Sequence, residues 1–406
     1  MTIGVGGKTE AEALATLSNM TAGLAPIGEA EYRARIAKAQ ALMRGRGIAA
    51  IYLNAGSSLL YFTGMRWHAS ERMVGAVLPA EGGIEFIAPK FEEGTVHDYM
   101  VVPGRVNCWE EHEAPTALFI SMLDRMCPGD TTARVGIDES TPFFLFDKIR
   151  VLGNRYDFFD ASEITRACRM QKSAAELALM QRAKDMTLKV QQAAASILRP
   201  GISTKEVESF IEQAHRKVGA PGSTFCIVLF GPATAFPHGV KDPQILKEGD
   251  MVLIDTGCRV HNYLSDITRT YVFGEPTDEQ RRYWQIEKDA QIAAFDAAKL
   301  GVPCGDVDRA ARKSLVANGM SEGYKLPGLP HRTGHGIGLD GHEGPYLVLN
   351  DDTPLDVGMC FSNEPMICIP GKFGIRLEDH FYMTEKGAKW FTEPSPSCDD
   401  PFGLKP

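Results

Sequence analysis

The 406-residue sequence lacks both a long basic run and a long apolar run. Proteins that bind nucleic acids cluster Lys and Arg against phosphates, whereas this chain has a formal net charge of −9. No apolar stretch approaches the roughly 18 residues that a membrane-spanning helix needs. The opening segment, MTIGVGGKTEAEALATL, contains acidic residues and no sustained apolar core, so we do not expect a secretory signal. We therefore predict neither a nucleic-acid partner nor a membrane partner.

The sequence also lacks any Cys-x-x-Cys pair among its nine cysteines. An odd number of scattered cysteines in a chain of this length is typical of reduced, mostly buried thiols. We therefore predict a cytoplasmic location. The hydrophobic fraction of 44% and the charged fraction of 23% are ordinary for a globular protein, and the length suggests two or three domains.

The first part of the chain alternates helical and strand-like patterns. Tyr32, Ile36, Ala39 and Met43 recur at helical spacing, and short β-like runs follow. This alternation predicts an α/β domain over residues 1–165, of which the first 27 or so are either a frayed lead-in or an arm. The β-like runs cover residues 48–54, 73–79, 84–89 and 134–139.

The remainder, residues 170–406, predicts a second domain of α+β class with a mostly antiparallel sheet. Ser173 followed by Glu176 is typical of a capping box, and a long amphipathic helix follows it. Further helices are expected after Ser203, over 278–300 and over 307–318. The β-rich stretches cover residues 224–231, 251–257, 265–274, 359–369 and 375–384.

Four acidic residues of this second domain are expected to face each other on two hairpins. A first hairpin centred between Val260 and His261 places Asp255 opposite Asp266. Opposed side chains on paired strands have Cβ atoms about 4.5–5.5 Å apart, and like charges there are destabilising. A bulge would shift this register.

A second hairpin, centred at Gly371, places Glu364 opposite Glu378. Two such acidic pairs in apolar surroundings call for bound cations, and two divalent ions neutralise four carboxylates. Oxygen ligands with one imidazole suit Mn, Co, Fe or Zn. His335 lies between glycines in TGHGIG, so we predict it as the nitrogen ligand. The alternative is four acids on solvated strand faces.

The pattern alone leaves the roles of several other residues open. His238, in FPHG, and His342, in GHEGP, are candidate functional residues. Arg269 alternates to the face opposite Asp266, so we expect a structural ion pair there. Tyr263 stays undecided. A polar and aromatic cluster in the first domain has two possible roles: it is a surface turn, or it contributes to the active site of a partner subunit. Its residues are Trp67, His68, Glu71 and Arg72.

The motifs DTG, SDITRT, HRTGHGIGL, NEP and RLED occur in the order of a known family. Over residues 170–393 the chain resembles the pita-bread metallopeptidases, and among them the Xaa-Pro dipeptidases (prolidases) and aminopeptidase P. YFTGM (61–65) and SERM (70–73) resemble the N-terminal domain of creatinase type. The resemblance implies an α/β N-terminal domain followed by an α+β pita-bread catalytic domain with a mostly antiparallel, curved sheet.

The resemblance implies two divalent metal ions, most simply Mn²⁺, with Co²⁺, Zn²⁺ or Fe²⁺ as alternatives. It implies the metal ligands Asp255, Asp266, His335, Glu364 and Glu378. It further implies catalytic roles for His238, His342 and Glu364, and substrate binding by His238, His342 and Arg376. A small peptide substrate and a homodimer are expected on the same ground.

The expected reaction is hydrolysis of the Xaa-Pro bond, most simply in dipeptides, by a metal-bridging hydroxide. Two metal ions about 3.5–4 Å apart lower the pKa of a bound water. We expect Glu364 to carry protons and His342 to stabilise the tetrahedral intermediate. Three alternatives stay open: aminopeptidase P activity on longer peptides, a hydrolase or lyase of the same fold acting on a small non-peptide substrate, and a binding module that is not an enzyme.

One departure from the family bears on substrate length. Some prolidases place an Arg that binds the substrate carboxylate in the loop that here runs from His342 to Met359, and this chain has no Arg there. Arg332, or a residue of a second subunit, is the candidate for that role.

Overall fold

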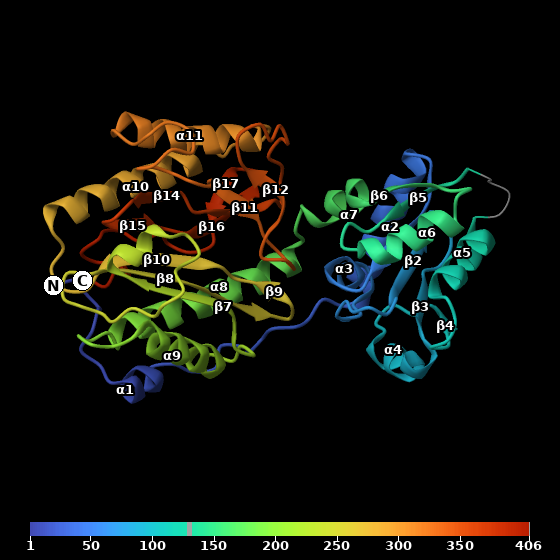
Figure 1. The fold of residues 1–406 in the computed structure, drawn as a ribbon, viewed down its shortest axis with the longest axis horizontal. Helices are drawn as coiled ribbons and strands as arrows, with labels where there is room; N and C mark the ends of the chain where they lie inside the picture. The colour runs from blue at the N-terminus through green and yellow to red at the C-terminus, as the bar shows by residue number, and fades with distance from the viewer. Residues whose placement is uncertain (128–131, 406) are drawn as a thin grey trace. The chain divides into compact units, whose positions relative to one another are not determined.

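The computed structural model describes residues 1–127 and 132–405, which form two compact units. The smaller unit comprises residues 26–169, and the larger unit comprises residues 1–25 together with 170–406 (Figure 1). In the part of the chain that is described, every helix is too short or too polar to cross a membrane.

The smaller unit has the predicted α/β architecture, built on a six-stranded sheet of order β4-β3-β2-β1-β5-β6. β1 pairs in parallel with β5 and antiparallel with β2, so the sheet is mixed. Two short strands, β4 and β6, add to those predicted. The strands are β1 (Ile48–Asn54), β2 (Gly75–Pro79), β3 (Glu85–Pro89), β4 (Arg105–Trp109), β5 (Arg134–Ile137) and β6 (Asp157–Asp160). The helices are α2 (Glu29–Gly45), α3 (Ser57–Thr63), α4 (Glu93–Tyr99), α5 (Pro115–Met126), α6 (Phe143–Leu152) and α7 (Ser162–Arg169), with a 3₁₀ turn at Lys90–Glu92.

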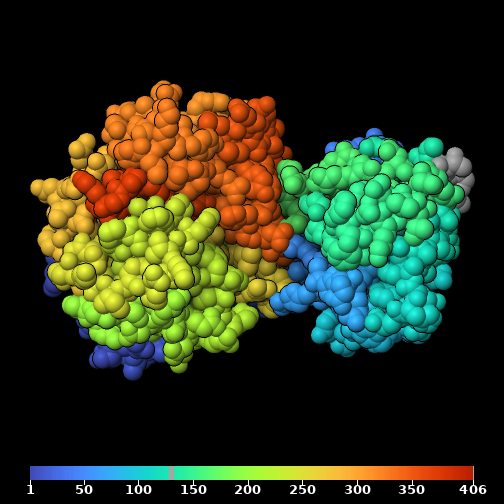
Figure 2. All heavy atoms as spheres, viewed as in Figure 1, coloured from blue at the N-terminus to red at the C-terminus, as the bar shows by residue number. Residues whose placement is uncertain are grey.

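The first 25 residues form an arm of the larger unit, so the prediction that they belong to the first domain is wrong. The arm contains a short helix, α1 (Glu10–Ala15), and buries Ala13 and Leu17. Its backbone is held at several points, for example from Gly6 N to Ala195 O at 2.8 Å. Figure 2 shows part of the arm in dark blue on the surface of the larger unit. The arm is attached to the larger unit by apolar side chains and backbone hydrogen bonds. Neither kind of contact produces a pattern that can be recognised in the sequence.

The larger unit places its sheets between two pairs of helices (Figure 1). α8 (Ala174–Ser196) and α9 (Thr204–Lys217) cover one side, and α10 (Asp278–Ala297) and α11 (Cys304–Ala317) cover the other. The predicted capping box at Ser173 and Glu176 is confirmed, and Ser203 caps α9 in the same way. These caps satisfy backbone N–H groups that the first helical turn leaves without partners.

The strands of the larger unit are all antiparallel to their neighbours, as predicted. One sheet has the order β10-β8-β7, with β9 paired to β8, and another has the order β12-β11-β13-β16-β17, while β14 and β15 form a separate pair. The strands are β7 (Ser223–Phe230), β8 (Met251–Val260), β9 (Tyr263–Leu264), β10 (Ile267–Val272), β11 (Gly334–Gly336), β12 (Glu343–Leu347), β13 (Cys360–Asn363), β14 (Met366–Ile369), β15 (Phe373–Arg376), β16 (Asp379–Thr384) and β17 (Gly387–Trp390). A 3₁₀ turn spans Gly231–Ala235.

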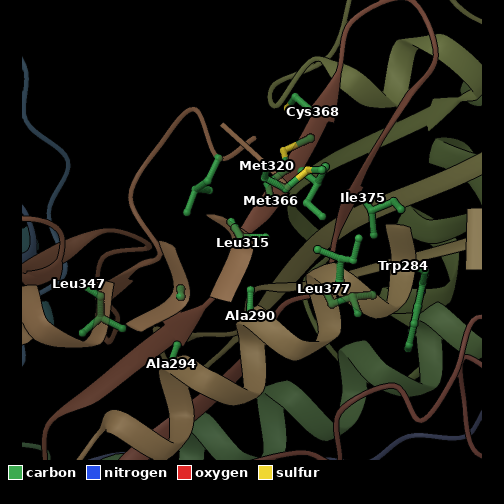
Figure 3. Packing of buried hydrophobic residues seen from close by; sticks show 14 of the residues in the cluster. Trp284, Ala290, Ala294, Leu315, Met320, Leu347, Met366, Cys368, Ile375 and Leu377 are labelled. Carbon is green, nitrogen blue, oxygen red and sulfur yellow. The ribbon is translucent and has the colours of Figure 1, made fainter. Parts of the chain in front are cut away.

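A large hydrophobic core joins α10 and α11 to the strands that carry the acidic residues (Figure 3). Trp284 is 1% exposed, and its indole Nε1 donates to Thr270 O at 2.9 Å. Ile375 and Leu377 are fully buried beside the β15–β16 junction. Burying such side chains stabilises a fold by about 1.5–3 kcal/mol each. The core therefore makes a rigid wall behind the candidate site.

Arg269 forms a buried structural ion pair, as its strand position predicts. Its side chain is 1% exposed and donates to Asp379 at 2.7 and 3.2 Å. A third bond runs to the carbonyl oxygen of Glu378 at 2.9 Å. This guanidinium therefore ties β10 to the start of β16.

Replacing Arg269 by Met should lower the free energy of unfolding of the larger unit by about 3–5 kcal/mol, because Asp379 would be left buried and uncompensated. Denaturant unfolding followed by tryptophan fluorescence measures this change. The matched control is Arg216→Met, which removes an exposed pair with Glu212 on α9 and should cost at most about 1 kcal/mol. Equal effects of the two substitutions would contradict a structural role for Arg269.

Candidate metal centre and active site

The five predicted metal ligands lie together on one side of the sheets of the larger unit. Asp255 is within β8, Asp266 directly precedes β10, and His335 is the middle residue of β11. Glu364 lies in the break between β13 and β14, and Glu378 lies in the break between β15 and β16. Two triads have ligand atoms within 4.8 Å of one another: Asp255, Asp266 and Glu378, and His335, Glu364 and Glu378. Glu378 belongs to both.

The first hairpin carries its two aspartates in a register that differs from the prediction. Asp255 pairs with Thr268, because the turn is the two-residue loop His261–Asn262. Both turn residues have positive φ, 44° and 75°, as a type I′ turn requires. The predicted centre lay one residue too early, so direct opposition of the two aspartates is wrong. Asp266 is still on the face of Asp255, because side chains two residues apart on a strand point the same way.

The second hairpin has the predicted register on both sides of its break. Met366 pairs with Arg376, and Asn363 pairs with Asp379, so the centre at Gly371 is confirmed. Between these pairs the strands open, and two backbone N–H groups bond elsewhere: Glu364 N donates to Thr333 O at 2.8 Å, and Glu378 N donates to Thr268 O at 3.1 Å. The break therefore places Glu364 beside the segment of Thr333 and Glu378 beside β10.

The acidic cluster is buried and short of positive charge. Asp266 is 8% exposed and Glu378 1%. Burial, followed by the nearby carboxylates, raises the pKa of each well above its usual value. One oxygen of Asp255 and one of Asp266 are buried without any hydrogen-bond partner. Divalent cations supply both the missing charge and the missing partners, so these residues fit a metal centre.

Arg376 and Thr268 hold two of the carboxylates in place. The Arg376 side chain, 3% exposed, donates to Asp255 Oδ2 at 2.5 Å and to Thr268 Oγ1 at 3.1 Å. Thr268 in turn donates to Glu378 Oε2 at 2.7 Å. Sequence analysis predicted Arg376 as a substrate-binding residue. Its observed contacts are with Asp255, with Thr268 and, at 3.1 Å, with the carbonyl oxygen of Pro237, and it also lines the cavity described below. Thr268 was missed, although it lies two residues after Asp266 and therefore on the same face.

His335 faces Glu364 from the neighbouring strand. Its Nε2 lies 3.0 Å from Glu364 Oε1, and its Nδ1 lies 3.0 Å from the carbonyl oxygen of Gly336. A carbonyl oxygen only accepts hydrogen bonds, so Nδ1 must carry a proton. The unprotonated Nε2 then faces the acidic residues. Burial alone would raise the pKa of Glu364, but the nearby His335, His331 and Arg376 hold that pKa below its usual value.

The cluster forms the floor of a cavity of about 630 Å³. His238 and His342, both predicted, line its wall and are exposed. His331, which sequence analysis missed, also lines the cavity, and its Nε2 is buried without a partner. Its signal was present in the sequence, because it lies four residues before His335. The remaining lining residues include Phe225, Ile227, Tyr324, Arg332 and Val348.

His342 is held close to His335 by contacts on both sides of its ring. The two rings have centroids 3.8 Å apart and an interplanar angle of 34°. Arg332 Nη2 lies 2.9 Å from His342 Nδ1. Burial, and next the neighbouring His335, lower the pKa of His342 to about 4, so the ring is neutral at neutral pH. The backbone that follows is fixed by Glu343, which pairs with the buried Lys172 at 2.5 Å.

Three other residues singled out from the sequence are accounted for by local contacts. Tyr263 is buried, and its hydroxyl donates to Glu176 Oε1 at 2.8 Å, so it joins β9 to the cap of α8. In the smaller unit, Arg72 pairs with Glu111 at 3.1 Å, and the Trp67 ring packs on Tyr99.

Comparison with known proteins places this geometry in a family. Residues 178–385 match the model of metallopeptidase family M24, and residues 35–171 match the creatinase/prolidase N-terminal domain. The probable dipeptidase PepE of Mycobacterium tuberculosis is 34% identical over 364 residues, which cover 88% of this chain and 93% of that protein.

Solved structures of similar proteins have the same fold. Dipeptidase PepE from Mycobacterium ulcerans superposes with a TM-score of 0.84 at 31% identity, covering 91% of this chain and 97% of its own. A prolidase from Thermococcus sibiricus gives 0.81 at 31% identity, with coverages of 89% and 97%. The predicted fold class, a creatinase-type domain followed by a pita-bread domain, is confirmed, and so is the prediction of a metallopeptidase. The chain belongs to metallopeptidase family M24.

Proposed function

We propose that this enzyme hydrolyses Xaa-Pro dipeptides with the help of two divalent metal ions. The observation that carries the proposal is the cluster of four carboxylates and His335 on the floor of a cavity, in which all but the partly exposed Glu364 are buried. Support comes from similar proteins whose names state this activity, among them an Xaa-Pro dipeptidase from Bacillus anthracis with a TM-score of 0.78 at 26% identity.

Each of the two triads would hold one ion. Asp255, Asp266 and Glu378 form an all-oxygen set, whereas His335, Glu364 and Glu378 include one imidazole. Glu378 would contribute to holding both ions, because it is common to both sets. Hard oxygen ligands with a single nitrogen favour Mn²⁺, and Co²⁺, Zn²⁺ and Fe²⁺ remain alternatives.

The chemistry that such ions supply is Lewis acidity, which activates a water molecule and polarises the scissile carbonyl. Glu364 is the proton carrier of this proposal, because it is the most exposed of the acids, with 14% of its side chain accessible, and it borders the cavity. Ser362 donates to its Oε1 at 3.1 Å, which leaves Oε2 to exchange a proton with water or with the leaving nitrogen.

The histidines of the cavity wall would handle the substrate. His342 would donate a hydrogen bond to the carbonyl oxygen as negative charge develops there. His238 lies at the rim beside Ile227, where it would contact the proline ring. Arg376 would act on the substrate only indirectly, through Asp255. A prolyl nitrogen carries no hydrogen, so a site for it must recognise shape and charge.

Longer Xaa-Pro peptides are the second candidate substrates. A smaller hollow of about 190 Å³ shares Ile227 and His238 with the main cavity and adds Lys205 and Lys241. A chain that continues beyond proline would find room there. Release of proline from Ala-Pro, compared with release of alanine from Ala-Pro-Gly, separates the two candidates.

Two wider expectations belong to the same proposal. A cytoplasmic location is supported by the nine cysteines, all of which are free thiols in the structure. A homodimer is expected from the resemblance to prolidases, and size-exclusion chromatography with light scattering measures it.

Metal binding should release protons. Asp266 and Glu378 have pKa values raised by burial and by neighbouring carboxylates, so in the metal-free protein they keep protons to higher pH than free carboxyl groups. Their ionisation lowers the stability of the metal-free protein as pH rises through the raised pKa values. Stabilisation by Mn²⁺ should therefore grow with pH. Calorimetric titration with Mn²⁺ in two buffers of different ionisation enthalpy measures the protons released, and zero release would contradict the assignment.

Glu364→Gln should lower kcat for Ala-Pro by about 100-fold or more, because an amide cannot carry the proton. Circular dichroism and thermal unfolding should match those of the unchanged enzyme. The control is Glu385→Gln, at an exposed glutamate in the turn between β16 and β17, which should keep full activity. Full activity of Glu364→Gln would refute the proton role.

A further inference from the structure

Arg332 meets His342 in a way that determines the protonation of the ring. Its Nη2 lies 2.9 Å from His342 Nδ1. A guanidinium has five N–H donors and no acceptor, so Nδ1 has to accept this hydrogen bond and carries no proton. The single proton of the neutral imidazole is therefore on Nε2.

An aromatic ring supports the arginine side of this contact. The Arg332 guanidinium lies over the ring of Tyr346, 4.3 Å from its centroid, and such a stack restricts the arginine. Tyr346 belongs to β12, four residues after His342.

The protonation of His342 decides between two roles. His342 forms a third possible ligand group with Asp266 and His335, again with ligand atoms within 4.8 Å. A metal ligand needs a ring nitrogen with a free lone pair. In this geometry the Nδ1 lone pair is taken by Arg332 and Nε2 carries the proton. Neither nitrogen is then free to bind a metal ion.

We propose that Arg332 is a positioning residue that fixes His342 as an Nε2–H hydrogen-bond donor and keeps it out of the metal ligand set. The inference deepens the proposed function and rests on it for the identity of the reaction. It assigns Arg332 an effect on turnover through His342. It thereby replaces the expectation that Arg332 binds the carboxylate of the substrate.

The first test reads the ring directly and needs no turnover. ¹⁵N spectra of histidine-labelled enzyme at pH 8, with His342 assigned from the His342→Gln variant, report which nitrogen carries the proton. We expect an unprotonated Nδ1 and a protonated Nε2, in metal-free enzyme and after addition of Zn²⁺, a diamagnetic probe. A proton on Nδ1, or a shift of either His342 nitrogen into the metal-bound range with Zn²⁺, would overturn the proposal.

The second test separates positioning from substrate binding. Arg332→Met removes the donor and should lower kcat for Ala-Pro about tenfold with KM changed less than twofold. Arg332→Gln keeps a neutral N–H donor and should recover part of kcat. Arg309→Met, on the exposed face of α11, is the control and should change neither constant.

The opposite kinetic pattern would favour carboxylate binding by Arg332. In that case Arg332→Met would raise KM for Ala-Pro with kcat unchanged, and would leave the ring spectrum as it is, which contradicts positioning. Failure of the proposed function gives a different result: the unchanged enzyme with Mn²⁺ would not cleave Ala-Pro, while the protonation pattern of His342 would still decide the role of Arg332.

Discussion

Mutual repulsion among four carboxylates, three buried and one partly exposed, is the constraint on which the rest of the larger unit depends. Asp255, Asp266, Glu364 and Glu378 meet on the cavity floor, and the pKa values of Asp266 and Glu378 are raised because the surroundings resist their charge. A protein does not hold such a cluster without counter-charge. Arg376 supplies one positive charge, and its bond to Asp255 leaves other oxygens of the cluster without partners. The need for cations is therefore built into the fold.

Two of these acids lie where the hydrogen-bond ladder between paired strands is interrupted. Glu364 and Glu378 lie where strands of the second hairpin open, and their backbone N–H groups bond to Thr333 and Thr268 of other segments. Arg269 secures the same junction from the opposite face through Asp379. The hydrophobic core behind it keeps the break from closing or slipping. Asp255 is thus positioned by a buried ion pair, and Glu364 and Glu378 are positioned by backbone contacts.

Part of this arrangement followed from the sequence because strand alternation is strict. The register centred at Gly371 was predicted correctly, and the face of Asp266 was correct although its partner was not. The error arose at His261, which takes a positive φ that its residue type rarely adopts. The register of a short hairpin depends on the type of its turn, and the sequence does not indicate that type here. The order of helices was readable from their caps.

Contacts between segments that are distant or irregular were not readable. The first 25 residues attach to the larger unit through backbone bonds that leave no periodic pattern. The pairing of Arg332 with His342 depends on how two loops meet, and the bond from Thr268 to Glu378 depends on which strands adjoin. Sequence reasoning therefore predicted which residues lie together at the cavity better than it predicted the contacts that hold them.

The central claim is that this floor exists to hold two ions in two triads that share Glu378. Anomalous diffraction from crystals grown with Mn²⁺, recorded on both sides of the manganese absorption edge, tests it most directly. The account predicts two anomalous peaks per chain, one contacting Asp255, Asp266 and Glu378, the other contacting His335, Glu364 and Glu378. No peak at the floor of the cavity, or a peak coordinated by His342 in place of these acids, would contradict it.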